Sequence, residues 1–290
     1  MQSSTKAAPL LTLLLFVSLC PAGAAERAIY DGQSAADVGI ALGPWGSGSA
    51  EESIERVLAN SKSIKIVSQG FYSGGRIDFS TPVLLYSESP ASTEYLRLLI
   101  HFPSTVAVPN LLEYAEAVVR PKVGKLRLVL YPDGENQSAI EIIIPVTTED
   151  QDGWWPIAAP LSALKLPPGS KDLRIRRMLI FSDLSDTFYV GEIRVINDTV
   201  PIKVEPLEPQ PTQTQANYPV VLTAIANGGV TPLAFYWDFN QTDGLQEDAY
   251  GLQVAHAYRK AGEYTVTLIV KDVFGVKKEA IATVPVTVNE

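Results

Sequence analysis

Four oxygen-bearing side chains lie close together near the C-terminal end of the chain. Asp238, Asn240, Asp243 and Asp248 occur within one short segment that also contains Gly244. Calcium takes about six to eight oxygen ligands, and these often come from a single acidic loop. The spacing misses the EF-hand pattern by one residue and lacks its terminal glutamate. The segment therefore predicts one of two things, a calcium site or an ordinary solvated acidic turn.

Aromatic side chains form the second group that could bind a ligand. A sugar site pairs an aromatic platform with polar groups, because the ring stacks on the apolar face of the sugar while hydroxyls need hydrogen bonds. Trp154 and Trp155 are adjacent, so an extended segment points them to opposite sides and places one of them in the core. Trp45 and Tyr72 lie in glycine-containing loops and are further candidates. Loop packing explains each residue equally well, and Trp154 or Trp155 is the first choice.

Histidine and cysteine give little support for catalysis. The chain has two histidines and one cysteine. His101 lies in an apolar run without a G-x-S-x-G nucleophile elbow, so a core or edge-strand role is expected, and His256 is expected to be a structural hydrogen-bonding residue. The sequence contains no histidine-rich metal cluster and no phosphate-binding glycine loop. A non-catalytic protein is expected, while a glycoside hydrolase that uses two facing carboxylates stays open as an alternative.

Strands must position most of these residues. The hydrophobic pattern from Ile64 onward has a period of two, so Ile64, Ile66 and Ser68 share one face of a strand. Many short strands separated by proline and glycine turns favour a sandwich or a barrel. Strands are expected at residues 28–30, 64–68, 75–79, 83–86, 95–102, 115–120, 125–131, 139–145, 173–182 and 187–196. One short helix is expected at 50–59, where apolar residues recur at helical spacing.

The first residues predict export from the cell. Lys6 precedes an apolar run that ends in small residues, which is the pattern of a secretory signal peptide at 1–25. Cys20 would be removed with this peptide, so the absence of disulfides favours a bacterial source. Lipidation of Cys20 is the alternative, although Leu19 stands where a small residue is usual. A secreted, extracellular or cell-surface location is expected, with the periplasm as an alternative.

The acidic composition limits the kinds of partner that the protein is expected to bind. The formal net charge is −9 and the pI is about 4.9, so the surface repels phosphate backbones and nucleic-acid binding is not expected. Nothing after the N-terminal apolar run resembles a transmembrane segment.

The last quarter of the chain carries a specific resemblance. Residues 228–239 read GGVTPLAFYWDF, His256-Ala257-Tyr258 follows, and residues 262–272 read GEYTVTLIVKD. These segments resemble a PKD domain, an immunoglobulin-like β-sandwich of bacterial and archaeal extracellular proteins. The resemblance implies a spacer or adhesion module at 215–290. Because alternate residues share a strand face, Trp237 is expected in its core, and Asp272 is expected to form a turn.

The preceding region carries a second resemblance. Residues 153–164 read GWWPIAAPLSAL, and residues 188–195 read FYVGEIRV. This layout resembles the end of a galactose-binding-like jelly roll of the kind found in carbohydrate-binding modules, although Glu192 stands where aspartate is more usual. It implies a jelly-roll binding domain at 26–200. Four prolines mark 201–214 as an extended linker, or its first part as an edge strand of the second sandwich.

The sequence thus predicts an all-β protein of two β-sandwich domains, a jelly roll followed by a PKD-like sandwich. The expected function is non-catalytic binding or adhesion outside the cell. The first domain would recognise a polysaccharide or surface glycan, and the second would act as a spacer or interaction module. The alternatives are a structural cell-envelope protein that contacts protein partners and the carboxylate-based hydrolase.

Overall fold

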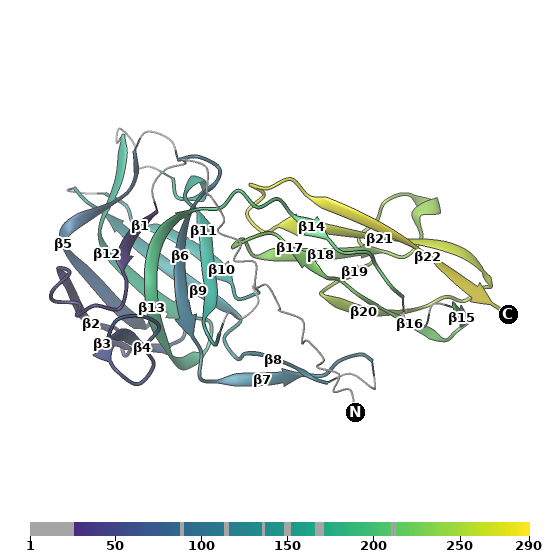
Figure 1. Ribbon diagram of the computed structural model, residues 1–290, viewed down its shortest axis with the longest axis horizontal. Helices are drawn as coiled ribbons and strands as arrows, with labels where there is room; N and C mark the ends of the chain where they lie inside the picture. The colour runs from purple at the N-terminus through teal and green to yellow at the C-terminus, as the bar shows by residue number, and fades with distance from the viewer. Residues whose placement is uncertain are drawn as a thin grey trace, which may run out of the picture.

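Two β-sandwiches lie one after the other along the long axis of the molecule (Figure 1). The computed structural model describes residues 26–87, 90–112, 116–134, 137–147, 152–165, 171–209, 211 and 213–290. The signal peptide expected at 1–25 lies outside the described residues. The expected all-β class with two sandwich domains is confirmed.

The first domain consists of two facing antiparallel sheets. Sheet A has the strand order β11 (Trp155–Pro160), β6 (Glu94–His101), β13 (Ser185–Asn197), β4 (Ser63–Gln69) and β3 (Ser49–Ser53), with β1 (Arg27–Tyr30) also paired to β13. Sheet B has the order β10 (Ile140–Pro145), β9 (Lys125–Pro132), β12 (Asp172–Ser182), β5 (Gly74–Ser87) and β2 (Ile40–Trp45). The expected jelly-roll sandwich is confirmed, with one hydrophobic core between the sheets.

Alternation along the strands builds this core. On β4 the side chains of Ile64, Ile66 and Ser68 are buried while those between them are partly exposed, as predicted. A Cβ atom on Gly75 of β5 would lie 2.3 Å from the Ile66 side chain. The two sheets therefore approach closely at this point because glycine leaves room for the opposing isoleucine.

The helix expected at 50–59 is wrong. Residues 49–53 form strand β3, which pairs with β4, and the following residues are bends. Ile54 is 73% exposed and Val57 is 37% exposed, so these residues lie on a surface loop and not on the buried face of a helix. Edge pairing with β4 satisfies the backbone of 49–53 instead.

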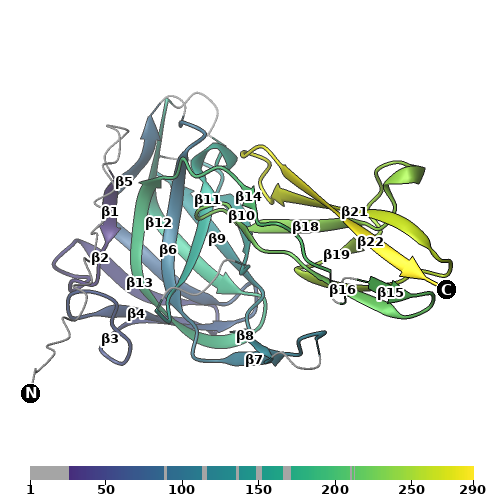
Figure 2. The ribbon, with the colours of Figure 1, turned by 45° about the vertical axis from the view of Figure 1, so that its right-hand side comes forward.

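Several strand boundaries also differ from expectation. The strands expected at 75–79 and 83–86 are one continuous strand, β5, whose register with β12 is irregular. Strands β2 and β11 were not expected, nor was β7 (Thr105–Val108), which pairs with β8 (Val118–Pro121) in a hairpin. This hairpin projects from one end of the first domain (Figure 2).

The second domain is built on sheet C. Its strand order is β15 (Gln213–Gln215), β22 (Ala280–Asn289), β21 (Gly262–Asp272), β18 (Leu233–Asp238) and β19 (Ala249–Tyr250). Two further pairs complete the sandwich, β16 (Pro219–Thr223) with β20 (Gln253–Ala257) and β14 (Lys203–Val204) with β17 (Ala226–Asn227). Trp237 lies in the core with Leu222, Val266 and Leu268, as predicted.

The first part of the proline-rich segment belongs to this second sandwich. Lys203 and Val204 pair with β17, and the side chains of Ile202 and Leu207 are buried in the second core. The edge-strand alternative for this part therefore describes the structure. The division into a domain at 26–200, a linker at 201–214 and a domain at 215–290 stays a prediction.

The described part of the chain also contains short helical turns. They are the 3-10 turns η1 (Leu161–Ala163) and η2 (Gln241–Asp243). Within the described part of the chain, no helix has the length and apolar character needed to cross a membrane.

Candidate functional site

The four candidate aromatic residues do not form one group. Trp45 lies on the outer face of sheet B, and Tyr72 lies in the turn before β5, at the edge of the same face. Trp154 is only 8% exposed and packs on sheet A, where its ring centroid lies 5.7 Å from that of His101. Trp155 is half-buried against the first core. The structure therefore brings Trp45 and Tyr72 together and places the preferred pair elsewhere.

The outer face of sheet B carries an apolar strip. Because residues alternate along a strand, Leu179 and Phe181 of β12 point away from the main core, as does Val129 of β9. Trp45 and Tyr131 pack against this strip, with their ring centroids 6.2 Å apart and their planes tilted by 51°. Strands β2 and β9 thus contribute aromatic rings to one surface, although β5 and β12 lie between them.

Arginine side chains cover the same rings. The Arg177 guanidinium lies 6.0 Å from the Trp45 ring and 5.8 Å from the Tyr131 ring. The Arg127 guanidinium lies 5.0 Å from the Tyr72 ring, and its Nη1 donates a hydrogen bond of 2.7 Å to the carbonyl of Phe71. Cations over aromatic faces are attracted by the ring quadrupole. The arginines therefore hold the aromatic residues in place.

Carboxylates complete the surface. Both Glu141 carboxylate oxygens accept hydrogen bonds of 2.7 Å from Arg127. These bonds lower the pKa of Glu141 and raise that of Arg127, so both groups stay charged near neutral pH. Asp78 forms ion pairs with Arg177 and Arg76. Donors and acceptors therefore alternate with aromatic rings.

We call this surface the sheet B outer face. Its residues are Trp45, Tyr72, Arg76, Asp78, Arg127, Val129, Tyr131, Glu141, Arg177, Leu179 and Phe181. Tyr72 is 77% exposed and is the most accessible ring among them. An aromatic platform with fixed donors and acceptors can stack on a sugar ring and bond to its hydroxyls.

The sequence singled out only two residues of this face. Arg127, Val129 and Tyr131 share a side of the strand expected at 125–131, and this alternation was the available signal. The signal does not say which side faces solvent or which strand lies next to it. The pairing of β9 with β12 and of β12 with β5 supplies that information.

His101 contacts a backbone carbonyl and two aromatic rings. It is the last residue of β6, and one of its ring nitrogens lies 2.7 Å from the carbonyl oxygen of Gly153. Its ring also contacts those of Trp154 and Tyr189. The histidine is half-buried among aromatic residues of sheet A. This environment agrees with the structural role expected for it.

The acidic segment of the second domain uses its oxygens within the loop. Asp238 is fully buried, and its carboxylate accepts from the backbone amides of Asn240 at 2.8 Å and Gln246 at 3.0 Å. Asp248 accepts from an amide at 2.9 Å, and Asp243 accepts from the Asn240 side chain at 3.2 Å. Among the described residues no group of three or more His, Cys, Asp or Glu side chains could hold a metal ion. Calcium binding by this segment stays a prediction.

His256 lies in an aromatic stack above this loop. Its ring stacks on Phe239 at 4.0 Å and meets the edge of Tyr258 at 4.5 Å. Burial lowers the pKa of His256, and nearby Asp248 opposes this effect only in part.

This lowered pKa predicts a pH-dependent stability. The unfolded chain binds the His256 proton more readily, at a pKa of about 6.5. The stability contribution of the neutral ring is therefore complete above that pH and falls as the pH drops towards the lower folded-state pKa. The difference in the free energy of unfolding, wild type minus His256→Phe, should be smaller at about pH 5 than at about pH 7.5. Urea unfolding at both pH values measures this, and an equal difference at the two pH values would contradict it.

Comparison with protein families identifies the second domain. Residues 203–288 match the model of the PKD domain. The resemblance seen in the glycine, Trp-Asp and His-Ala-Tyr segments is thus confirmed, and the match includes the edge strand at Lys203–Val204. No curated protein sequence matches the chain.

Several solved structures are similar to the chain at low identity. One is the family 11 carbohydrate-binding module from Clostridium thermocellum, with 10% identity and a TM-score of 0.36, covering 60% of this chain and 96% of that one. Another is the tandem CBM22 domain of Paenibacillus barcinonensis Xyn10C, with 8% identity and a TM-score of 0.32, covering 91% and 84%.

A β-1,2-glucanase from Parabacteroides distasonis is also similar, with 10% identity, a TM-score of 0.35 and coverage of 91% of this chain. The chain spans 38% of the length of that enzyme. It spans 36% of an Endo-D glycoside hydrolase domain from Streptococcus pneumoniae.

Proposed function

We propose that this chain is a secreted, non-catalytic protein that binds polysaccharide through the sheet B outer face. The single observation that carries the proposal is the gathering of Trp45, Tyr72 and Tyr131 with arginine–carboxylate pairs on one exposed sheet face. The signal peptide expected at 1–25 would direct the chain out of the cell, which supports an extracellular location. The PKD domain would serve as a spacer or interaction module.

The geometry favours an extended, uncharged polymer. The aromatic residues come from β2, β9 and the turn before β5, so they are spread across the sheet. Several sugar rings of one chain can therefore be contacted at once, with Tyr72 and Trp45 as stacking platforms. Arg127 and Arg177 are each paired with a carboxylate, which reduces their preference for an anionic polymer. Their remaining donors and the carboxylate oxygens can bond to hydroxyl groups.

The same pairing argues against hydrolysis on this face. A glycosidase needs one carboxylic acid whose raised pKa lets it protonate the leaving group. The pKa of Glu141 is lowered by its hydrogen bonds from Arg127. Asp78 is held between two arginines. These carboxylates are suited to accept hydrogen bonds from hydroxyls rather than to donate protons.

The test removes two ring platforms. We expect the Trp45→Ala and Tyr72→Ala double variant of residues 26–290 to lose at least about tenfold in affinity for the bound polymer, since each lost stacking contact is worth about 1 kcal/mol. Retention would be measured on insoluble cellulose, xylan, chitin and mixed-linkage β-glucan.

Tyr250→Ala is the matched control, because Tyr250 is an exposed tyrosine of the second domain. Circular dichroism would establish that all variants fold. Unchanged retention of a folded double variant would rule out the sheet B outer face as the site.

A further inference from the structure

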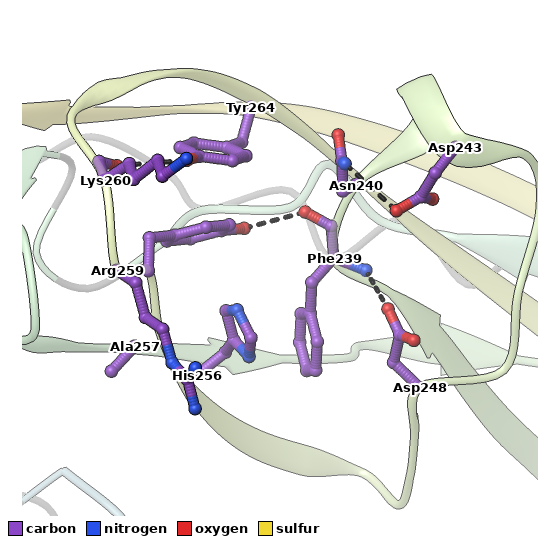
Figure 3. Close-up of a pocket in the computed structure, with 10 residues that line it drawn as sticks. Phe239, Asn240, Asp243, Asp248, His256, Ala257, Arg259, Lys260 and Tyr264 are labelled. Carbon is purple, nitrogen blue, oxygen red and sulfur yellow. Dashed lines mark hydrogen bonds between the residues drawn. The ribbon is translucent and has the colours of Figure 1, made fainter.

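A pocket of about 490 Å³ lies in the second domain (Figure 3). Its lining comes from the loop after β18, the end of β20, the turn that follows β20 and the start of β21. Gly262, where β21 starts, pairs with Val288 near the C-terminus. Figure 1 places the C-terminus at the end of the molecule remote from the first domain. The pocket is therefore well separated from the sheet B outer face.

Four rings in continuous contact form one wall of the pocket. Phe239 stacks on His256, His256 meets Tyr258 edge-on, and Tyr258 stacks on Tyr264 with ring centroids 4.0 Å apart. Hydrogen bonds fix the tyrosines, since Tyr258 donates to the Phe239 carbonyl and Tyr264 donates to the Lys260 carbonyl, both at 3.0 Å. His256 and Tyr264 are half-buried, so each leaves part of its surface accessible. The wall is thus apolar and held in place.

Polar groups of both kinds surround this wall. Asp243 and Asp248 lie on one side of the pocket, and Arg259 and Lys260 lie on the other (Figure 3). Within the described part of the chain, the side chains of Arg259 and Lys260 take part in no ion pair or hydrogen bond. The neutral His256 ring offers one donor and one acceptor nitrogen. Hydrogen-bond donors and acceptors therefore surround an apolar wall.

We propose that this pocket is a second carbohydrate site, which binds one sugar ring or the end of a glycan chain. A sugar ring has an apolar C–H face and hydroxyls that both donate and accept, which matches the wall and its surroundings. An anionic ligand would face Asp243 and Asp248, and a cationic one would face Arg259 and Lys260. A purely apolar ligand would bury these polar groups without partners, which is unfavourable.

The proposal gives the PKD domain a binding role beyond that of a spacer. It does not depend on the sheet B outer face, because the pocket belongs entirely to the second domain. If both sites bind, one polymer held at the first site would meet the second at a raised effective concentration.

The two histidines offer a direct test. NMR spectra of residues 26–290 labelled at histidine would be recorded during titration with cellotetraose, xylotetraose and chitotetraose. His256 lies in the pocket, whereas His101 lies on sheet A of the first domain and serves as an internal control. We expect at least one oligosaccharide to shift the His256 signals and to leave the His101 signals in place. A panel that shifts no His256 signal would overturn it.

Variants separate this site from the first. Tyr264→Ala should abolish the His256 shift. If Tyr264→Ala fails to fold, Arg259→Ala takes its place and should raise the oligosaccharide concentration needed for the shift at least about tenfold. Tyr250→Ala, an exposed tyrosine outside the pocket, should leave the shift unchanged. A His256 shift that survives both pocket variants would overturn the proposal. Loss of polymer retention in the Trp45→Ala and Tyr72→Ala variant tests the proposed function independently, because that variant leaves the pocket intact.

Discussion

Replacing Trp237 with alanine is expected to lower the free energy of unfolding of the second domain by about 3–5 kcal/mol. The side chain is fully buried between the sheets and packs with Val266 and Leu268. Its indole N–H donates a hydrogen bond of 2.8 Å to the carbonyl of Gly251. Truncation would leave a cavity in a small core and an unpaired carbonyl, and both effects are destabilising.

Urea unfolding followed by far-ultraviolet circular dichroism measures this loss, because that signal comes mainly from the backbone and is kept when one tryptophan is removed. Trp45→Ala is the control, since Trp45 lies at the surface of the other domain and leaves no cavity in the second core. A loss below about 1 kcal/mol for Trp237→Ala would show that the second core does not depend on this side chain.

Local chemistry made the second domain predictable. Trp237 lies on β18 and Phe239 directly follows its end, and both are buried as expected from their spacing of two residues. Asp272 was expected to form a turn, and its carboxylate accepts from the backbone amides of Phe274, Val276 and Lys277. These features depend on neighbours within a few residues, so the sequence contains them.

The first domain shows where such reasoning fails. The apolar spacing around Ile54 fits a helix, yet the pairing of 49–53 with β4 decides its structure. Strand β2 contains Gly43 and Pro44, which read as a loop but lie at the edge of sheet B, where proline is tolerated. In both cases partners distant in sequence override local preference.

The candidate site depends even more on distant partners. Residue type alone drew attention to Trp45 and Tyr72. Tyr131 joins Trp45 only because β5 and β12 lie between their strands and because the outer residues of these strands share one side. Strand order of this kind follows from the whole fold, so a single sequence read without its relatives does not provide it.

The largest effect on domain arrangement is expected from Lys277→Met. The Lys277 ammonium group lies 2.7 Å from the Asp198 carboxylate, and the two side chains are only 10% and 5% exposed. Asp198 follows β13 of the first domain, whereas Lys277 lies in the β21–β22 loop of the second. Lys277 also donates to the carbonyls of Val200 and Gly228. One cation therefore joins both domains and the segment between them.

Further contacts support this junction. Asp198 accepts a hydrogen bond of 2.8 Å from the amide of Val230, whose side chain packs against a small cluster of the first domain that includes Tyr95 of β6. Phe274 of the second domain packs against the first core. At the β7–β8 hairpin, the Gln253 side chain bonds to Asn110 and accepts from the amide of Leu111. Contacts at separate places hold the second domain in one orientation.

Removing the cation leaves a buried carboxylate without its partner, which is destabilising by about 3–5 kcal/mol. Calorimetry should show that Lys277→Met unfolds at a lower temperature than wild type. Small-angle scattering should show that its domains adopt a wider distribution of orientations. Lys278→Met is the matched control, because Lys278 is the exposed neighbour. Identical unfolding and scattering of the two variants would show that the ion pair does not fix the domains. If the expected difference is found, the sheet B outer face and the pocket of the second domain are held at a fixed separation. A polymer long enough to reach both sites would then bind without the entropic cost of first ordering the domains.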